Sequence, residues 1–116
     1  MAECPTLNEI IERTEKLIEE TNLTPLYNNR RNLFHIGIDA ESGKKSESFY
    51  DLFMSEIRTT AYFSVARRIV PKKHWGSMGR MLVSNSGFCG LASWTGTMFE
   101  YFMPNLFIPA EKGTLD

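Results

Sequence analysis

Two glutamates stand in apolar stretches where an ionised side chain needs a specific reason. Glu100 is the only charged side chain between positions 81 and 110 and lies within the aromatic run SWTGTMFEYFMP. Glu56 follows Leu52 and precedes Thr60 at helical spacing, so a helix through this segment places it on the apolar face. A buried carboxylate is costly unless it is paired or hydrogen-bonded. Both glutamates are therefore candidates for proton transfer, for binding of hydroxyl groups, or for a structural bond.

Each carboxylate also has a structural interpretation. Glu56 can be held on its helix with Thr60 as a neighbour, or by Arg58 turned toward another chain segment. Thr97 and Glu100 have the spacing of a capping box, in which Glu100 ties back the start of a short helix. The residues alone leave these alternatives open.

The two tryptophans add a second kind of candidate. Trp75 and Trp94 both lie close to glycines, which let the backbone approach a flat ligand. Tryptophan is most often a core residue, but exposed rings beside carboxylates also bind the faces of sugars. The combination favours a carbohydrate site over a nucleotide site, since no phosphate-binding glycine loop occurs in the sequence.

The elements that would position these residues are mainly helical. Thr6 and Glu9 form a capping-box pattern ahead of a regular apolar stripe, which predicts an amphipathic helix. A second long helical pattern is closed by Pro71, and the alternation in LFHIGID predicts a short strand between the two. The chain is thus expected to form a single partial domain, residues 1–116, with an amphipathic helix at 6–21, a hairpin or loop at 26–47, a long helix at 48–69, a loop around a brief strand at 71–92 and an aromatic helix and loop segment at 93–116.

Composition excludes several functions. A net charge of −1 and a pI near 6.1 give no basic field for nucleic acid or an anionic membrane. Cys4 and Cys89 are far apart, and His35 and His74 have no cysteine at metal-ligand spacing, so neither a metal nor another cofactor is expected. The apolar C-terminal region is broken by glycine and proline and contains Glu100, so it is not expected to span a membrane. With no secretory signal pattern, the composition indicates a reduced, cytoplasmic setting.

Four motifs together resemble a known family. They are LYNNRRNLFHIGID, SFYDLFMSEIRTTAYFSVAR, HWGSMGR and SWTGTMFEYFMPNLFIP, in this order. Their order and spacing are similar to those in the central, glycoamylase-like domain of the cyclic β-1,2-glucan synthases. The resemblance is specific from Tyr27 to Asp116 and is only a helix pattern before that.

The resemblance implies a fold and an activity. The fold would be mainly α with a small β-hairpin, a fragment of an α/α barrel built from helical hairpins. The activity would be anomer-retaining transglycosylation that closes linear β-1,2-glucan into a ring, without a cofactor. Synthases of this family lie at the cytoplasmic face of the inner membrane and carry further catalytic domains.

The resemblance also implies site residues. Retaining glycosidases place two carboxyl groups about 5 Å apart, whereas inverting enzymes leave roughly 6.5–9.5 Å for a water. Glu56 and Glu100 are the expected catalytic pair, with the nucleophile and the acid/base unassigned. The expected substrate contacts are Tyr50, Asp51, Arg58, Trp75, Trp94 and Tyr101.

The chain departs from the family pattern at its C-terminal end. A further glutamate in a Ser-Glu-Ser context is expected downstream in the family, and the sequence reaches Asp116 without it. The chain alone is therefore expected to lack activity and to associate with copies of itself or with the remaining parts of a larger synthase. The alternatives are a non-catalytic carbohydrate-binding module and a purely structural or assembly module.

Overall fold

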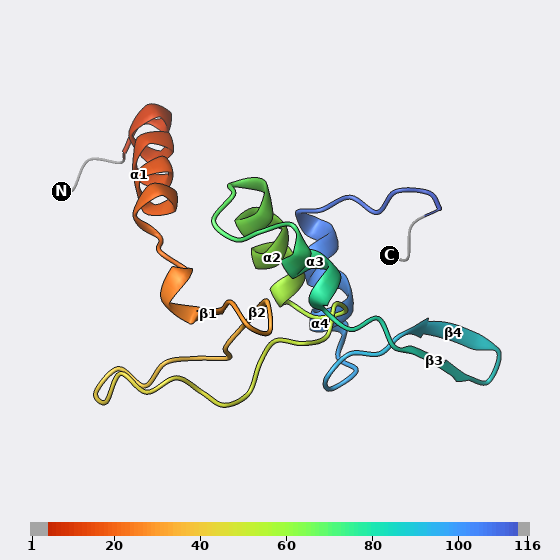
Figure 1. Ribbon diagram of the computed structural model, residues 1–116. Coiled ribbons are helices and arrows are strands. Elements are labelled where there is room, and N and C mark those ends of the chain that lie inside the picture. Colours follow the sequence, from red (N-terminus) through yellow and green to blue (C-terminus); the bar gives the residue numbers. More distant parts are fainter. Residues whose placement is uncertain (1–4, 114–116) are drawn as a thin grey trace.

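The computed structural model describes residues 5–113 and shows a mixed α/β chain (Figure 1). Within this range there are four α-helices, two short 3-10 helices and two separate two-stranded antiparallel sheets. In chain order the elements are α1 (Leu7–Glu20), η1 (Thr24–Leu26), β1 (Tyr27–Asn28), β2 (Leu33–Phe34), α2 (Ile57–Ala66), α3 (Lys73–Ser77), β3 (Leu82–Asn85), β4 (Phe88–Leu91), α4 (Met98–Phe102) and η2 (Met103–Leu106).

The expected fragment of an α/α barrel is wrong. The helices of such a barrel are long and paired as antiparallel hairpins, but α3 and α4 here have only five residues each, and two β-hairpins interrupt the helical order. The helix expected at 48–69 is confined to Ile57–Ala66. Residues 48–56 are instead non-helical, with isolated β-bridges at Phe49 and Leu52 followed by bends and a turn, and they make bonds to distant parts of the chain.

Long-range backbone bonds explain why this helix starts late. Tyr50 N–H donates to the Phe34 carbonyl at 2.9 Å, and Phe53 N–H donates to the Gly79 carbonyl at 2.9 Å. Phe49 also forms an isolated β-bridge with His35. These bonds use N–H groups that would otherwise start a helix, so residues before Ile57 remain outside it.

Helix α1 forms as its sequence predicts. The Thr6 hydroxyl accepts from Glu9 N–H while the Glu9 carboxylate accepts from Thr6 N–H, which completes the capping box. None of the fourteen residues of α1 is buried, however, and the helix stands apart from the other elements (Figure 1). Within residues 5–113 its apolar stripe is therefore uncovered along most of its length, and only its C-terminal end, at Ile18, lies near Arg67 and Ile69.

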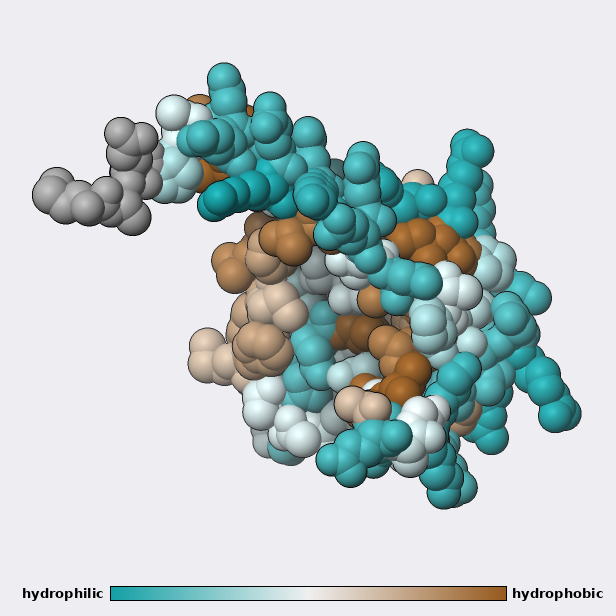
Figure 2. Space-filling view, turned by 90° about the vertical axis from the view of Figure 1, so that its left-hand side faces the viewer, coloured by the Kyte–Doolittle hydropathy of each residue, from teal (hydrophilic) through white to brown (hydrophobic). Residues whose placement is uncertain are grey.

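The core lies between the β1–β2 hairpin, the start of α2 and α3. His74 is fully buried and packs edge-on between Tyr27 and Phe34, with ring centroids 5.5 and 4.8 Å away. The Arg80 guanidinium lies 4.2 Å from the centroid of the Phe53 ring. Seen from the side on which α1 lies, the surface is hollowed, with apolar residues at the bottom and a rim that is apolar on the left of the view and more polar on the right (Figure 2).

The β3–β4 hairpin projects from this core (Figure 1). Ser86 and Gly87 form its two-residue turn, with φ of 52° and 87°. Positive φ at both positions suits the twist of a tight hairpin, and glycine adopts it without strain. The segment 71–92, expected as a loop around one brief strand, thus contains α3 and both strands of this hairpin.

Candidate functional site

A cavity of about 330 Å³ lies where residues 50–56 meet the turn before α4. It brings together Tyr50, Glu56, Trp94 and Glu100, which belong to the set expected from the sequence. The remaining lining residues are Ile36, Thr95, Thr97 and Phe99. Both candidate carboxylates therefore border one space together with aromatic rings.

Glu100 is buried in a shell of hydrogen-bond donors and is only 5% exposed. Its Oε1 accepts from the backbone N–H of Trp94 at 2.9 Å and of Thr95 at 3.1 Å. Its Oε2 accepts from the Thr95 hydroxyl at 2.6 Å, and from Thr97 N–H and the Thr97 hydroxyl at 3.0 and 2.9 Å. Both carboxylate oxygens are thus occupied by donors from the preceding turn.

The local sequence explains this arrangement. Thr97 caps α4, and with Glu100 it completes a second capping box, as the structural interpretation of the spacing predicted. Gly96 has a φ of 71°, which bends the chain so that successive N–H groups point to one side. Ser93 closes the turn by accepting from Gly96 N–H at 2.9 Å.

These donors fix the ionisation of Glu100. The hydroxyl of Thr95 and the backbone N–H of Thr97 lower the pKa of Glu100 to about 2, against a smaller opposing effect of burial. Glu100 is therefore ionised at neutral pH and acts as an acceptor. In this arrangement it holds no proton to give to a leaving group.

Glu56 has a different environment on the other wall of the cavity. It is partly exposed and stands at the N-cap position of α2, not within the helix interior as expected. Its side chain makes no capping bond, and within residues 5–113 its carboxylate has no hydrogen bond or ion pair, so neither Thr60 nor Arg58 holds it. Glu56 is thus the carboxylate of this cavity that is open to a ligand.

Two other candidates act as structural links instead. Arg58 is buried, donates from Nη2 to Asn105 Oδ1 at 2.7 Å, and lies 5.6 Å from the Phe53 ring. The Tyr101 hydroxyl donates to the Leu91 carbonyl at 2.8 Å. These contacts connect α2 and β4 with the C-terminal segment, and neither residue lines the cavity.

The last two candidates also lie outside the cavity. Asp51 is exposed and contributes its backbone carbonyl, which accepts from Gly79 N–H at 2.6 Å. Trp75 packs edge-on against Phe53 and Tyr62, with ring centroids 4.9 and 6.2 Å away. Trp75 and Trp94 therefore belong to different surfaces.

Four residues of the cavity wall were not among the site residues predicted from the sequence. Ile36 and Phe99 expose apolar side chains beside Trp94, and an isolated exposed residue gives no signal of this kind in a sequence. Thr95 and Thr97 had a detectable signal, because hydroxyls around a glycine ahead of a helix are typical of a capped turn.

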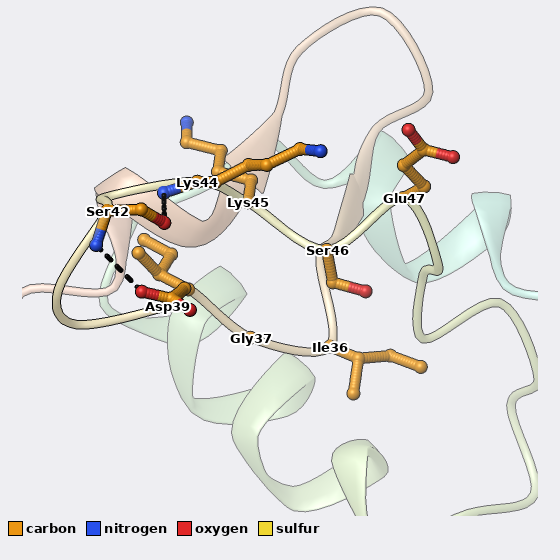
Figure 3. A pocket seen from close by; sticks show the side chains of 9 residues that line it. Ile36, Gly37, Asp39, Ser42, Lys44, Lys45, Ser46 and Glu47 are labelled. Atoms are coloured by element: carbon orange, nitrogen blue, oxygen red, sulfur yellow. Dashed lines mark hydrogen bonds between the residues drawn. The ribbon is translucent and has the colours of Figure 1, made fainter.

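A second hollow, of about 470 Å³, lies in the 36–47 excursion and shares Ile36 with the first (Figure 3). Asp39 Oδ1 accepts from Ser42 N–H at 2.7 Å, and this bond is the main cause of the lowered pKa of Asp39. The side chains of Lys44, Lys45 and Glu47 do not converge on one point (Figure 3). We interpret this feature as a hydrogen-bonded turn.

Residues 5–113 contain no cluster of three or more histidine, cysteine, aspartate or glutamate side chains arranged to hold a metal ion. Nor is any helix in that range both long and apolar enough to cross a membrane.

Comparison with known proteins relates this chain to a glucan synthase. No model of a known protein family matches the chain. Over 102 residues, or 88% of the chain, it is 34% identical to a cyclic β-1,2-glucan synthase. That relative is the protein NdvB of Rhizobium meliloti (strain 1021), and the aligned part of the chain spans only 4% of its length. The chain is therefore related to a short segment of such a synthase, while the domain that contains the segment stays a prediction.

Proposed function

We propose that this chain is a glucan-binding segment of a cyclic β-1,2-glucan synthase-related domain. The observation that carries the proposal is the cavity in which the exposed ring of Trp94 lies with Tyr50 and the unbonded carboxylate of Glu56. The relationship to the synthase supplies the class of ligand, a β-1,2-linked glucan.

The chemistry of the walls suits a sugar. Trp94 is 49% exposed, so part of its ring is accessible for stacking on the apolar face of a glucose unit. The Glu56 carboxylate and the Tyr50 hydroxyl can bond to sugar hydroxyls, and a bond to an ionised acceptor is the stronger of the two kinds. The cavity, at about 330 Å³, lies at the small end of the usual range for ligand sites, roughly 300–1,000 Å³.

Glu100 contributes by positioning. Its Oε1 binds the backbone N–H groups of Trp94 and Thr95, so the carboxylate fixes the backbone from which the Trp94 ring extends. A ring held in place before the ligand arrives loses less conformational freedom on binding.

The catalytic part of the proposal concerns Glu56. Retaining transglycosylation needs one carboxyl group as nucleophile and another as proton donor. Glu56 is open to either role, whereas the bonds to Glu100 and its lowered pKa argue against proton donation. Both oxygens of Glu100 are bonded to the turn, which also argues against Glu100 as the nucleophile. We therefore propose that Glu56 acts with a carboxyl group from outside this chain, and that the chain alone binds glucan without turnover.

The test is a titration of the purified chain with linear β-1,2-glucan, followed by tryptophan fluorescence. Trp94→Phe removes the reporter in the cavity, and Trp75→Phe is the matched control on another surface. We expect a saturable change in the wild type and in Trp75→Phe that is lost in Trp94→Phe, with no response to a β-1,4-linked glucan.

The same samples test for turnover. Chromatography of the glucan after incubation should show no new cyclic product. A wild-type chain without any saturable change would contradict the proposal and favour a structural role. A change lost only in Trp75→Phe would contradict the proposed cavity and place the glucan near Trp75 instead.

A further inference from the structure

The apolar stripe of α1 is largely uncovered within residues 5–113. Its side chains are between 37% and 72% exposed, although they follow the spacing of a buried helix face. The stripe consists of Leu7, Ile10, Ile11, Leu17 and Ile18. Such a row of anchors is typical of a helix that lies in a groove of another protein.

A groove of suitable chemistry runs along the outer side of α2. Two hollows, of about 310 and 720 Å³, share Val65 and Ala66 as lining residues and therefore lie next to each other. Tyr62 and Trp75 line one end, and the other end reaches the loop after α2. That end is lined by Arg68, Ile69, Val70, Pro71 and Lys72.

The charges of the two surfaces are complementary. Helix α1 carries five glutamates against one arginine and one lysine. One edge of the apolar stripe is formed by Leu7 and Ile11, which are four residues apart. Glu15 and Glu19 follow at the same spacing and therefore extend this edge with negative charge. Residues 67–73 carry four cations and no carboxylate. An acidic helix edge therefore fits the basic rim of the groove.

We propose that α1 of one copy docks into the α2 groove of a second copy. The stripe packs on the apolar floor between Tyr62 and Pro71, while Glu15 and Glu19 face Arg68 and Lys72. Because each copy carries both surfaces, the exchange is reciprocal and closes as a two-fold dimer. The dimer covers the apolar stripe and the groove at the same time.

The position of α1 favours a partner copy over its own groove. The C-terminal end of α1 lies beside the end of α2, where Ile18 and Glu19 share a hollow with Arg67 and Ile69. From there the helix runs away from the other elements (Figure 1), and Leu7 at its far end is 72% exposed. Most of the apolar stripe of α1 is thus accessible to a second copy of the chain.

The first test compares two substitutions of the same chemistry on different surfaces. Ile11→Glu places a charge in the stripe, whereas Phe88→Glu changes a residue that is 83% exposed on the β3–β4 hairpin. Sedimentation velocity over a wide concentration range should give a wild-type dimer. Ile11→Glu should raise the dimer Kd by about tenfold or more, because it charges a central anchor, and Phe88→Glu should leave it unchanged.

The second test exchanges the charges. One variant carries Glu15→Lys and Glu19→Lys, and the other carries Arg68→Glu and Lys72→Glu. Each variant alone mismatches both contacts of the dimer and should be monomeric, while a mixture of the two restores matched charges in both contacts and should form a heterodimer. Circular dichroism of each sample verifies that the helices persist.

Several results would overturn the proposal. These are a wild-type chain that stays monomeric at every concentration, an association that continues beyond the dimer, an equal loss in Ile11→Glu and Phe88→Glu, and a mixture of charge variants that remains monomeric. None of these measurements involves glucan, so their outcome is independent of the sugar site.

Discussion

Residues 93–102 and residues 50–57 border the same cavity but are held in place by different forces. In the first region Glu100 is the one buried residue, and hydrogen bonds to its carboxylate define the turn. In the second region Phe53 and Met54 are buried in the core, while the Glu56 carboxylate has no bond within residues 5–113. Two carboxylates of similar sequence context therefore differ in role: Glu100 stabilises the turn that forms one cavity wall, and Glu56 remains accessible to a ligand in the cavity.

The largest expected effect tests the claim that packing holds residues 50–57. Phe53 is 3% exposed and contacts the Trp75 ring and the Arg80 guanidinium. Phe53→Ala should lower the free energy of unfolding by about 3–5 kcal/mol, as is usual for a buried aromatic residue. Urea unfolding followed by circular dichroism measures the change.

The matched control lies in the other region. Phe99 is 61% exposed on the cavity rim, so Phe99→Ala should change the free energy of unfolding by no more than about 0.5 kcal/mol. Equal losses in the two variants would mean that packing holds both regions, and the contrast between them would fail.

The next effect tests the hydrogen-bonded region. Glu100→Gln keeps one acceptor oxygen but turns an amide NH2 toward donors such as the Thr95 hydroxyl and Thr97 N–H. We expect a lower Tm and a glucan affinity reduced by about tenfold, because unpaired donors loosen the backbone that carries Trp94. Thermal unfolding and the fluorescence titration measure both effects, and a variant with wild-type Tm would contradict the wall-building role.

The pH dependence of stability gives a third and smaller effect. The pKa of Glu100 is about 2 in the folded chain, below its ordinary value of 4.5, so the unfolded chain binds its proton first as the pH falls. The stability that the ionised carboxylate supplies is fully present above pH 4.5 and is lost as the pH falls toward 2. Wild type should therefore lose its advantage over Glu100→Gln across this interval, as urea unfolding at a series of pH values can show.

Other carboxylates do not contribute to the difference in stability between wild type and Glu100→Gln. Glu9 and Asp39 also have lowered pKa values, through bonds to Thr6 and Ser42, but they are common to both chains and cancel in the difference. A difference between the two chains that stayed constant from pH 5 to pH 2 would contradict the assigned ionisation.

The sequence predicts those elements whose information is local. The capping boxes at Thr6 and Thr97 each depend on residues three positions apart, and both are present. The non-helical course of residues 48–56 was missed because its causes lie far away, in bonds from Tyr50 to Phe34 and from Phe53 to Gly79. Helical periodicity cannot report such distant partners.

The same distinction applies to the site. Residue types singled out Glu56, Trp94 and Glu100, the family resemblance added Tyr50, and these four do line one cavity, whereas Trp75 does not. Arg58 could not be recognised as a buried link, because its partner Asn105 lies 47 residues away in the sequence. A side chain with polar groups looks the same in a sequence whether it faces a ligand or a distant part of the core.

The smallest expected effect on stability is that of Glu56→Gln. It makes the same change as Glu100→Gln, from glutamate to glutamine, on the opposite wall of the cavity. The substitution keeps the shape of the side chain, and no described bond of the carboxylate is lost, so the free energy of unfolding should change by less than about 0.5 kcal/mol. Glucan affinity should nevertheless fall several-fold, since a charged acceptor of sugar hydroxyls becomes a neutral one. If Glu56→Gln destabilises the chain as much as Glu100→Gln does, Glu56 has a structural partner of its own. The glucan would then have to be bound by Trp94 and Tyr50 without a free carboxylate.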